Sequence, residues 1–125
     1  MSSLEAWGGF RSKFEYLVAQ NLIDSGYCFN YEPKRIHYVS HHHYTPDFLV
    51  DGQDFYVECK GGSMSAEDRA KYQKAAEQNE DLDLRFLFYN DRPIAKNSST
   101  TFSMWAKRHG FKYSIGPEIP VDWLK

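Results

Sequence analysis

The sequence predicts a mixed α/β protein of one domain, on the strength of three observations. Segments with helical and strand-like hydrophobic patterns follow one another along the chain. Two strand-like runs, 44–50 and 55–60, flank Asp51-Gly52, which is a strong short-range hairpin signal. The 125 residues, of which 42% are hydrophobic and 17% aromatic, suffice for one buried core. We therefore expect a mixed central sheet that contains this hairpin and is flanked by helices.

The N-terminal third predicts a helix followed by a strand. Residues 12–25 place four apolar side chains on one helical stripe, which ends at Gly26 in the usual position after a helix. From 27 to 39, large aromatic residues alternate with smaller or polar ones, so this segment predicts a strand that is interrupted at Pro33. The helical stripe consists of Phe14, Leu17, Val18 and Leu22.

The second half continues the alternation of helices and strands. Ser65 can cap a helix that runs to about Asn79, because Asp68 three residues later completes a box-like start. Further elements are then expected in this order: a buried strand at 84–89, a polar loop at 91–100, a helix at 102–109 closed by Gly110, a strand at 111–115, and a tail that packs Trp123 and Leu124 on the core.

The hairpin brings two carboxylates together in either of two registers. If residues 51–54 form the loop, Asp47 lies directly opposite Glu58; if only Asp51 and Gly52 form it, Asp47 pairs with Tyr56 and lies diagonal to Glu58. Both registers put the two acids on one face, to which the strand period of two adds Lys60. The opposite face, which we expect to be the buried one, carries Phe48, Val50, Phe55, Val57 and Cys59.

This spacing, P-D-x10-E-x-K, predicts a metal site for phosphodiester chemistry. Two carboxylates about 5 Å apart raise each other's pKa unless a cation compensates them. Their oxygens are hard ligands, which favour Mg²⁺ or Mn²⁺ over zinc. Lys60 would position or deprotonate a water and offset charge in the transition state. The alternative is an ordinary cross-strand ion pair on a solvated sheet face.

Other blocks accompany these residues in a fixed order. They are Phe10-Arg11-Ser12-x-x-Glu15, Tyr44-Thr45-Pro46-Asp47-Phe48-Leu49, Val57-Glu58-Cys59-Lys60-Gly61, Asp68-Arg69, Leu82-Asp83-Leu84-Arg85, 107–112 and 119–125. From about Gly9 to Lys125 the chain thus resembles the phage endonuclease I family of Holliday-junction resolvases. The resemblance implies a restriction-endonuclease-like core in an intertwined, domain-swapped homodimer with two active sites. It also implies paired metal-dependent nicks in opposing strands of a four-way DNA junction.

The resemblance divides the chain and assigns roles to its acids. It implies one nuclease domain over 1–125, with the N-terminal helix and a bridging strand at about 10–40 and a catalytic core at about 41–125. Two Mg²⁺ ions per site are implied, for which Mn²⁺ can substitute; Asp47 and Glu58 hold the first, and Glu15 helps with the second. The implied catalytic set is Glu15, Asp47, Glu58 and Lys60, with the backbone carbonyl of Cys59 as a further metal ligand.

Glu15 also has a purely local interpretation. Ser12-x-x-Glu15 forms a capping box, in which Ser12 accepts from the backbone at the start of a helix and Glu15 reaches back. The capping role and the metal role are compatible if the start of the helix faces the hairpin.

The formal net charge of −2 is unusual for a protein that approaches a polyanion. The distribution of charge matters more than the sum, because metal would neutralise several acids and basic residues gather in short clusters. The alternative is that these clusters are solvated helix and loop faces. The candidates for contact with DNA are Arg11, Ser12, His42, Arg69, Lys71 and Lys74.

The His41-His42-His43 run does not predict a zinc site. Three adjacent side chains of an extended segment alternate sides and cannot converge on one tetrahedral ion. We expect one of them, His42, to lie near DNA phosphate, or else all three to be surface residues. The two cysteines, Cys28 and Cys59, are too few for a disulfide framework and are expected to be buried thiols in strands.

Several classes of protein are disfavoured. The chain has no Gly-rich phosphate loop, so no nucleotide cofactor is expected. It also lacks an apolar run that could cross a membrane and a signal-like N-terminus, so we expect a cytoplasmic protein, in the host cell if it is phage-encoded. The leading hypothesis is a Mg²⁺-dependent endodeoxyribonuclease that acts on four-way junctions. The alternatives are a nuclease for other branched, mismatched or single-stranded DNA, and a non-catalytic junction-binding protein.

Overall fold

The computed structural model describes residues 7–38 and 42–125, and a five-stranded mixed sheet lies at its centre. The strands follow the order β1-β4-β5-β6-β7. β4 runs antiparallel to both of its neighbours, β1 and β5, whereas β5, β6 and β7 are parallel to one another. Their bounds are β1 (Phe29–Tyr31), β4 (Phe48–Val50), β5 (Tyr56–Lys60), β6 (Leu84–Phe88) and β7 (Tyr113–Ile115). The prediction of a mixed α/β fold is confirmed.

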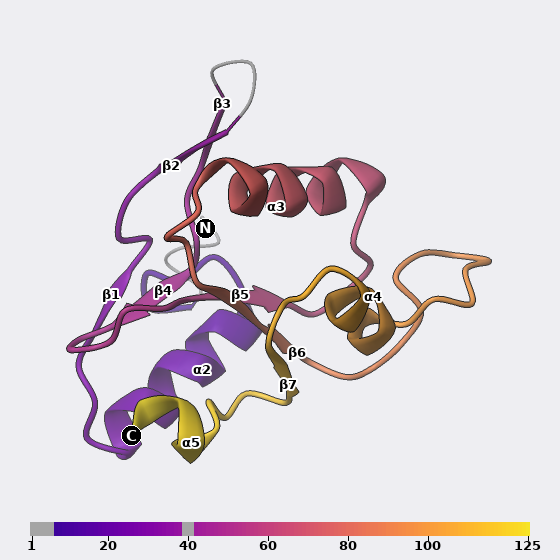
Figure 1. Cartoon of the computed structure of the whole chain (residues 1–125). Helices are drawn as coiled ribbons and strands as arrows, with labels where there is room; N and C mark the ends of the chain where they lie inside the picture. The colour runs from indigo at the N-terminus through magenta and orange to yellow at the C-terminus, as the bar shows by residue number, and fades with distance from the viewer. Residues whose placement is uncertain (1–6, 39–41) are drawn as a thin grey trace.

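Helices cover both faces of this sheet (Figure 1). The helix α2 (Lys13–Asp24) and the short α5 (Val121–Leu124) pack on one face, where Trp123 and Leu124 contact the core as predicted. The helices α3 (Ala66–Gln78) and α4 (Phe102–Arg108) cover the other face. A separate antiparallel pair, β2 (Ile36–Tyr38) and β3 (His42–Tyr44), lies beside α3.

The hairpin adopts the first of the two predicted registers. Phe48 pairs with Val57 and Leu49 with Tyr56. One step further along this register, Asp47 lies opposite Glu58, so residues 51–54 form the loop. The diagonal alternative, in which Asp47 would pair with Tyr56, is wrong.

The sheet is buried on both faces, which the sequence predicted for only one. Phe48, Val50 and Val57 are fully buried under α2, as expected. The face that carries Glu58 is also enclosed, because Tyr72 of α3 packs over it with no exposed surface. Asp47 and Glu58 are each only 7% exposed, so the alternative of a solvated sheet face is wrong.

Local capping explains where the three longer helices begin. The hydroxyl of Ser12 accepts from the backbone N–H of Glu15, that of Ser65 from Asp68, and that of Thr101 from Met104. The first helix differs from its prediction in one detail, since Ala19 is buried whereas Leu17 is only half-buried.

The segment after α2 shows one correction. Cys28 is exposed and lies just before β1, so the expectation of a buried thiol in a strand is wrong for this residue and holds for Cys59. The predicted interruption at Pro33 is present, because β1 ends at Tyr31 and β2 begins at Ile36. The predictions for Val39, His41 and the first six residues concern positions outside the part of the chain that the structure describes.

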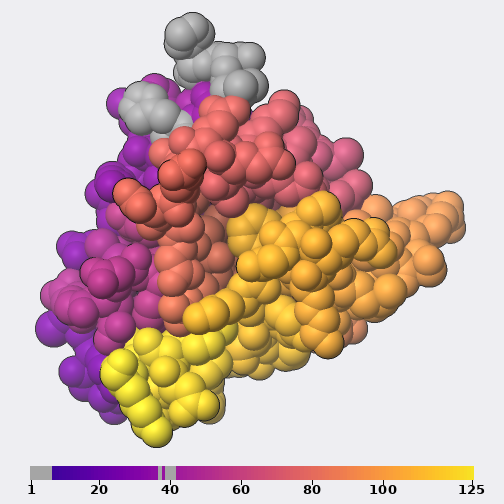
Figure 2. Space-filling model, in the orientation of Figure 1, coloured from indigo at the N-terminus to yellow at the C-terminus, as the bar shows by residue number. Residues whose placement is uncertain are grey.

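The molecular outline is uneven (Figure 2). The loop 91–100 projects from the body beside α4 in both views, whereas the C-terminal residues pack near α2. Within the described ranges, no helix combines the length and apolar character needed to cross a membrane.

Candidate active site

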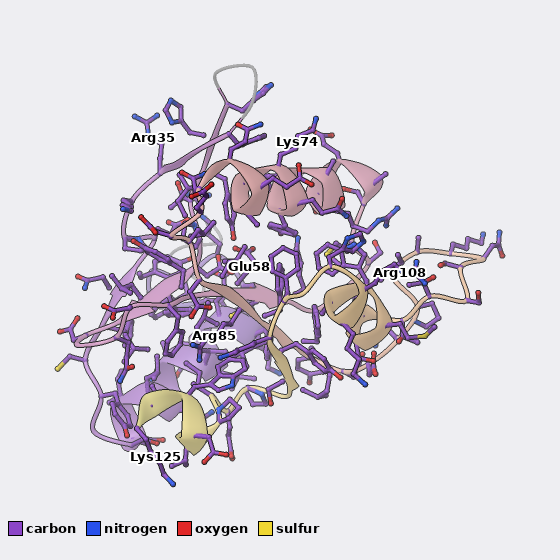
Figure 3. The ribbon with its side chains drawn as sticks, viewed as in Figure 1. Arg35, Glu58, Lys74, Arg85, Arg108 and Lys125 are labelled. Atoms are coloured by element: carbon purple, nitrogen blue, oxygen red, sulfur yellow. The ribbon has the colours of Figure 1, made fainter. Side chains whose placement is uncertain are left out.

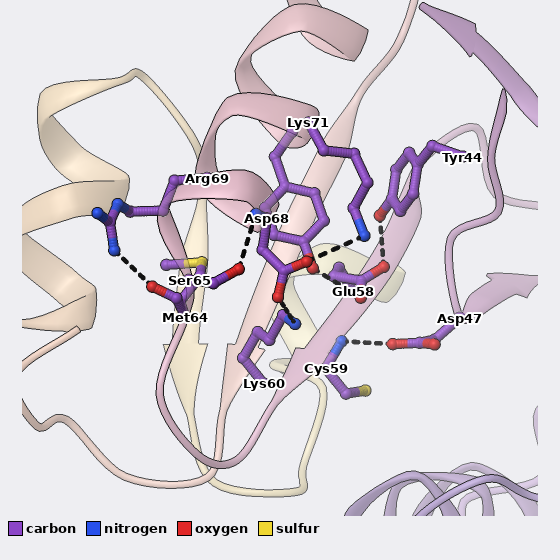
Figure 4. Close-up of polar contacts among 11 residues, drawn as sticks. Tyr44, Asp47, Glu58, Cys59, Lys60, Met64, Ser65, Asp68, Arg69 and Lys71 are labelled. Atoms are coloured by element: carbon purple, nitrogen blue, oxygen red, sulfur yellow. Dashed lines mark hydrogen bonds and ion pairs between the residues drawn. The ribbon is translucent and has the colours of Figure 1, made fainter. Parts of the chain in front are cut away.

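Three of the four residues predicted to be catalytic come together beneath α3 (Figure 4). Glu58 and Lys60 project from β5, and Asp47 immediately precedes β4. The strand register places Asp47 opposite Glu58, as described above. The N-terminal half of α3 runs above this pair and contributes Asp68, Lys71 and Tyr72.

Asp47 lies where the ladder between β4 and β5 ends. The backbone N–H of Cys59 donates to Oδ2 of Asp47 at 2.8 Å. Along β5, the N–H of Tyr56 and the carbonyl of Lys60 form hydrogen bonds on the side of β6. Because the backbone groups of successive residues point to opposite sides of a strand, the N–H and carbonyl of Cys59 point toward β4. Its partner in the extended register is Pro46, which has no N–H to donate. The Cys59 carbonyl therefore faces the Asp47 side without a ladder donor.

Glu58 is held by two tyrosines. The hydroxyl of Tyr44 donates to Oε1 in a short hydrogen bond, and that of Tyr72 donates to Oε2 at 3.2 Å. Tyr44 is buried at the end of β3 and Tyr72 is buried in α3. Burial, with the negative charge of Glu58 beside them, raises the pKa of both tyrosines, so each remains a donor. The two hydroxyls fix the orientation of the carboxylate.

The two acids are costly to keep ionised together. Burial, and then the charge of Glu58, raises the pKa of Asp47 well above its ordinary value. Burial raises the pKa of Glu58 to about 7, against the opposing effects of the Tyr44 hydrogen bond and of the Lys60 and Lys71 charges. The pair therefore has a deficit of positive charge that a bound cation would satisfy.

Lys60 is fixed by an ion pair that the sequence did not predict. Its Nζ lies 3.0 Å from Oδ2 of Asp68, and Lys71 approaches Oδ1 of the same carboxylate at 3.4 Å. Burial acts to raise the pKa of Asp68, but the hydrogen bond and charge of Lys60, together with Lys71, outweigh it and lower the pKa. The Asp68 carboxylate thus links two ammonium groups, and their charges favour its ionised form.

Glu15 serves the helix start with its backbone and the site with its side chain. Its N–H donates to the Ser12 hydroxyl at 3.1 Å, which is one half of the capping box. Glu15 as a whole is only 9% exposed, and its carboxylate instead accepts a short hydrogen bond from the Tyr31 hydroxyl. The charge of Glu15 also contributes to the raised pKa of Asp47, so the start of α2 does face the hairpin.

The six candidates for DNA contact occupy different environments. Arg11 pairs with Glu32 at 2.8 Å, and Ser12 is the α2 cap. The ring of His42 lies within the β2–β3 pair and stacks on the ring of Tyr38, with 5.3 Å between the ring centroids. It does not stack on a residue of the carboxylate site.

The remaining three candidates all belong to α3. Arg69 donates to the Met64 carbonyl, and Lys74 is exposed on the side of α3 away from the sheet (Figure 3). Lys71 turns toward Glu58 and Asp68 (Figure 4). Of the six candidates, Lys71 is therefore the one that the described contacts place at the acid pair.

The residues present fit a divalent cation with oxygen ligands. Asp47 and Glu58 are adjacent buried carboxylates, and the Cys59 carbonyl faces the same side as Asp47 without a ladder donor. Within 7–38 and 42–125, no three His, Cys, Asp or Glu side chains converge as metal ligands. The remaining ligands would therefore come from water or from a phosphate oxygen, which is typical of Mg²⁺.

Three residues around Glu58 and Lys60 were not identified as site residues from sequence: Asp68, Tyr72 and Tyr44. Tyr72 follows Asp68 by one helical turn and shares its face of α3, a spacing that could have shown it. Tyr44 reaches Glu58 from the end of a separate two-stranded sheet, and no local pattern indicates that contact.

Comparisons with known proteins agree with the motifs. The family model described as Phage endonuclease I matches residues 1–125. The chain is 38% identical over 122 residues to Endonuclease I of Escherichia phage T7, covering 94% of this chain and 80% of that protein. It is also 38% identical over 120 residues to Endodeoxyribonuclease 1 of Enterobacteria phage T3, covering 93% and 77%. The motif resemblance is therefore confirmed, and the chain belongs to the phage endonuclease I family, whose relatives here are named as nucleases.

Proposed function

We propose that this protein is a Mg²⁺-dependent endodeoxyribonuclease that resolves four-way DNA junctions by paired phosphodiester hydrolysis. The observation that carries the proposal is the buried Asp47–Glu58 pair, with Lys60 on the same strand as Glu58. A protein that only binds DNA gains nothing from two buried acids whose pKa values are raised. The family membership supports the same assignment.

The chemistry divides between the cation and the chain. A divalent ion at Asp47 and Glu58 would supply charge for the departing oxygen and lower the pKa of water, and Mn²⁺ would substitute for Mg²⁺. Tyr44 and Tyr72 hold the Glu58 carboxylate in one orientation. Lys60 places an ammonium beside the attacked phosphate, where it can hold the attacking water and offset charge as one P–O bond breaks.

The surroundings of Glu15 support a role as a helper at a second ion. Its carboxylate is buried and its charge acts on Asp47, while Tyr31 holds one of its oxygens. We therefore extend the proposal to two ions per site, with Glu15 assisting the second one.

Junction selectivity requires two sites at a defined separation, and the described residues of one chain form one such site. We therefore include in the proposal a homodimer built on restriction-endonuclease-like cores over 1–125, with the segment at about 10–40 exchanged between subunits. Such an enzyme would act in the cytoplasm of an infected cell, since both relatives are phage proteins.

The test is cleavage of a labelled four-way junction, next to duplex and single-stranded DNA of the same sequence, with Mg²⁺ or with EDTA. The control is Glu58→Ala, which removes one acid and both of its tyrosine contacts. We expect paired nicks near the junction that require metal and disappear in the variant.

Two other outcomes would change the assignment. Metal-dependent cleavage of flaps, mismatches or single strands, with an intact junction, would retain the nuclease and reject the junction substrate. A junction that is bound but never cut with any metal would reject the catalytic assignment.

A further inference from the structure

One carboxylate of α3 joins two ammonium groups above the acid pair. Oδ2 of Asp68 lies 3.0 Å from Nζ of Lys60, and Oδ1 lies 3.4 Å from Nζ of Lys71. The three side chains together carry one net positive charge. Asp68 is itself anchored, because its backbone N–H donates to the Ser65 hydroxyl that caps α3. This arrangement, which we call the Lys60–Asp68–Lys71 bridge, lies beside Glu58 (Figure 4).

The ion pair with Asp68 is not the only contact that directs the Lys71 side chain inward. Its Nζ lies over the rings of Tyr44 and Tyr72, at 5.4 Å and 5.1 Å from their centroids. These are the same two tyrosines that donate to Glu58. The charge of Lys71 acts on Glu58 as well, where it opposes the rise in pKa caused by burial. Lys71 is therefore part of the surroundings of Glu58.

A simple ion pair does not account for this placement. Lys60 already compensates Asp68 through the shorter contact, so Lys71 adds a charge that the carboxylate does not require. An i,i+3 pair at a partly exposed site contributes little to stability. The Lys71 side chain is 28% exposed, and an ammonium has three donors, so donors remain for an anion that approaches from solvent.

We propose that Lys71 binds a phosphate of the DNA substrate beside the scissile one, and that Asp68 is the positioning residue that holds Lys71 and Lys60 in place for this. The inference rests on the proposed function and deepens it. Lys60 then serves the attacked phosphate while Lys71 holds the neighbouring one, so the strand is positioned by two contacts from one bridge.

The test measures binding of a four-way junction in EDTA, without cleavage, at several salt concentrations. Each phosphate contact contributes about −0.9 to the slope of log affinity against log salt. We expect Lys71→Ala to make the slope less negative by about 0.9 and to weaken binding roughly fivefold at about 100 mM salt. Lys71→Arg keeps the charge and should keep the slope.

The matched control is Lys96→Ala, which removes one exposed lysine from the projecting 91–100 loop. It should retain the slope of the unchanged protein. If Lys71 had only a structural role, Lys71→Ala would lower the melting temperature and leave the salt-dependence slope unchanged. That result, in a protein that still cuts junctions, would overturn the inference and leave the proposed function unaffected.

The positioning role of Asp68 is tested by a double-mutant cycle with Asp68→Asn. If Asp68 holds Lys71 in place, Lys71→Ala should change the slope in the Asp68→Asn background by less than half of its effect in the unchanged protein. Additive effects would overturn the role of Asp68. A protein that neither binds nor cuts any DNA would instead overturn the proposed function, and this inference with it.

Discussion

The backbone N–H of Cys59 donates to the Asp47 carboxylate at 2.8 Å, at the point where the ladder between β4 and β5 ends. A regular ladder would use the backbone of residue 46 here, but Pro46 has no N–H for the Cys59 carbonyl. The same proline therefore frees a carbonyl oxygen next to a carboxylate. Pro46 therefore accounts both for the end of strand pairing and for the oxygen-rich site beside it.

Pro46→Ala should weaken metal binding while the fold persists. The new N–H at position 46 can donate to the Cys59 carbonyl and occupy it in the ladder. We expect Mn²⁺ affinity, measured by calorimetry, to fall about tenfold, the lower end of the range for residues that orient metal ligands. Val50→Ala is the control, because it truncates a buried side chain of β4 and leaves site hydrogen bonds intact. Unchanged affinity in Pro46→Ala would contradict the role of the Cys59 carbonyl.

Removing the hydroxyl of Tyr44 should affect Glu58 more than removing that of Tyr72. Tyr44→Phe deletes the hydrogen bond that lowers the pKa of Glu58 more, whereas Tyr72 has the smaller effect from 3.2 Å. Loss of a hydrogen bond to a buried charged group costs about 1 to 3 kcal/mol of stability. We expect denaturant unfolding at pH 8 to show a larger loss in Tyr44→Phe, and metal affinity to fall in the same order. Equal losses, or none, would count against the tyrosines as orienting groups.

Whether a contact could be predicted from the sequence depends on how far apart its residues lie along the chain. The hairpin, its two acids and Lys60 follow from the turn at 51–54 and the strand period, which are local properties. The capping of α2 and α3 is local for the same reason. The contact of Tyr44 with Glu58 depends on how a separate two-stranded sheet packs beside α3, and local patterns do not encode that.

Burial was harder to predict than position. Alternation along β5 indicated one buried face, but α3 also covers the other face, because Tyr72 and Ala75 are buried against it. Cys28 was misplaced in the opposite sense, since it is exposed just before β1, a short strand at the edge of the sheet. In both cases the packing of distant elements decided the exposure.

Without metal, the protein should lose stability as pH rises from about 5 to 8. The pKa of Glu58 is about 7 in the folded protein, above its ordinary value of 4.5, so folding favours the protonated acid. The stabilising contribution is complete below pH 4.5 and is lost as pH rises through 7. At 1.36 kcal/mol per pKa unit, the loss is about 3 kcal/mol. Asp47, whose pKa is raised, acts in the same direction.

Urea unfolding in EDTA at a series of pH values checks this expectation. Three other carboxyl groups have lowered pKa values: Asp68, Asp83 and Asp91. They change the stability only below pH 3.8, their ordinary pKa, so they do not offset the loss of stability between pH 5 and 8. Glu58→Gln should remove most of the dependence. Mg²⁺ at 100 times its dissociation constant should restore about 2.7 kcal/mol at pH 8. A stability that rises between pH 5 and 8 in EDTA would refute the charge deficit at the acid pair.

Two substitutions should separate the capping role at the start of α2 from the role of the Glu15 carboxylate. Ser12→Ala removes the acceptor for the Glu15 N–H and should cost about 1 kcal/mol of stability, with metal-dependent cleavage retained. Glu15→Gln keeps the backbone donor and the helix but removes a buried charge that faces Asp47. We expect it to melt near the unchanged protein and to cut DNA at least tenfold more slowly. Cleavage that falls only in proportion to lost stability, in both variants alike, would leave Glu15 with the capping role alone.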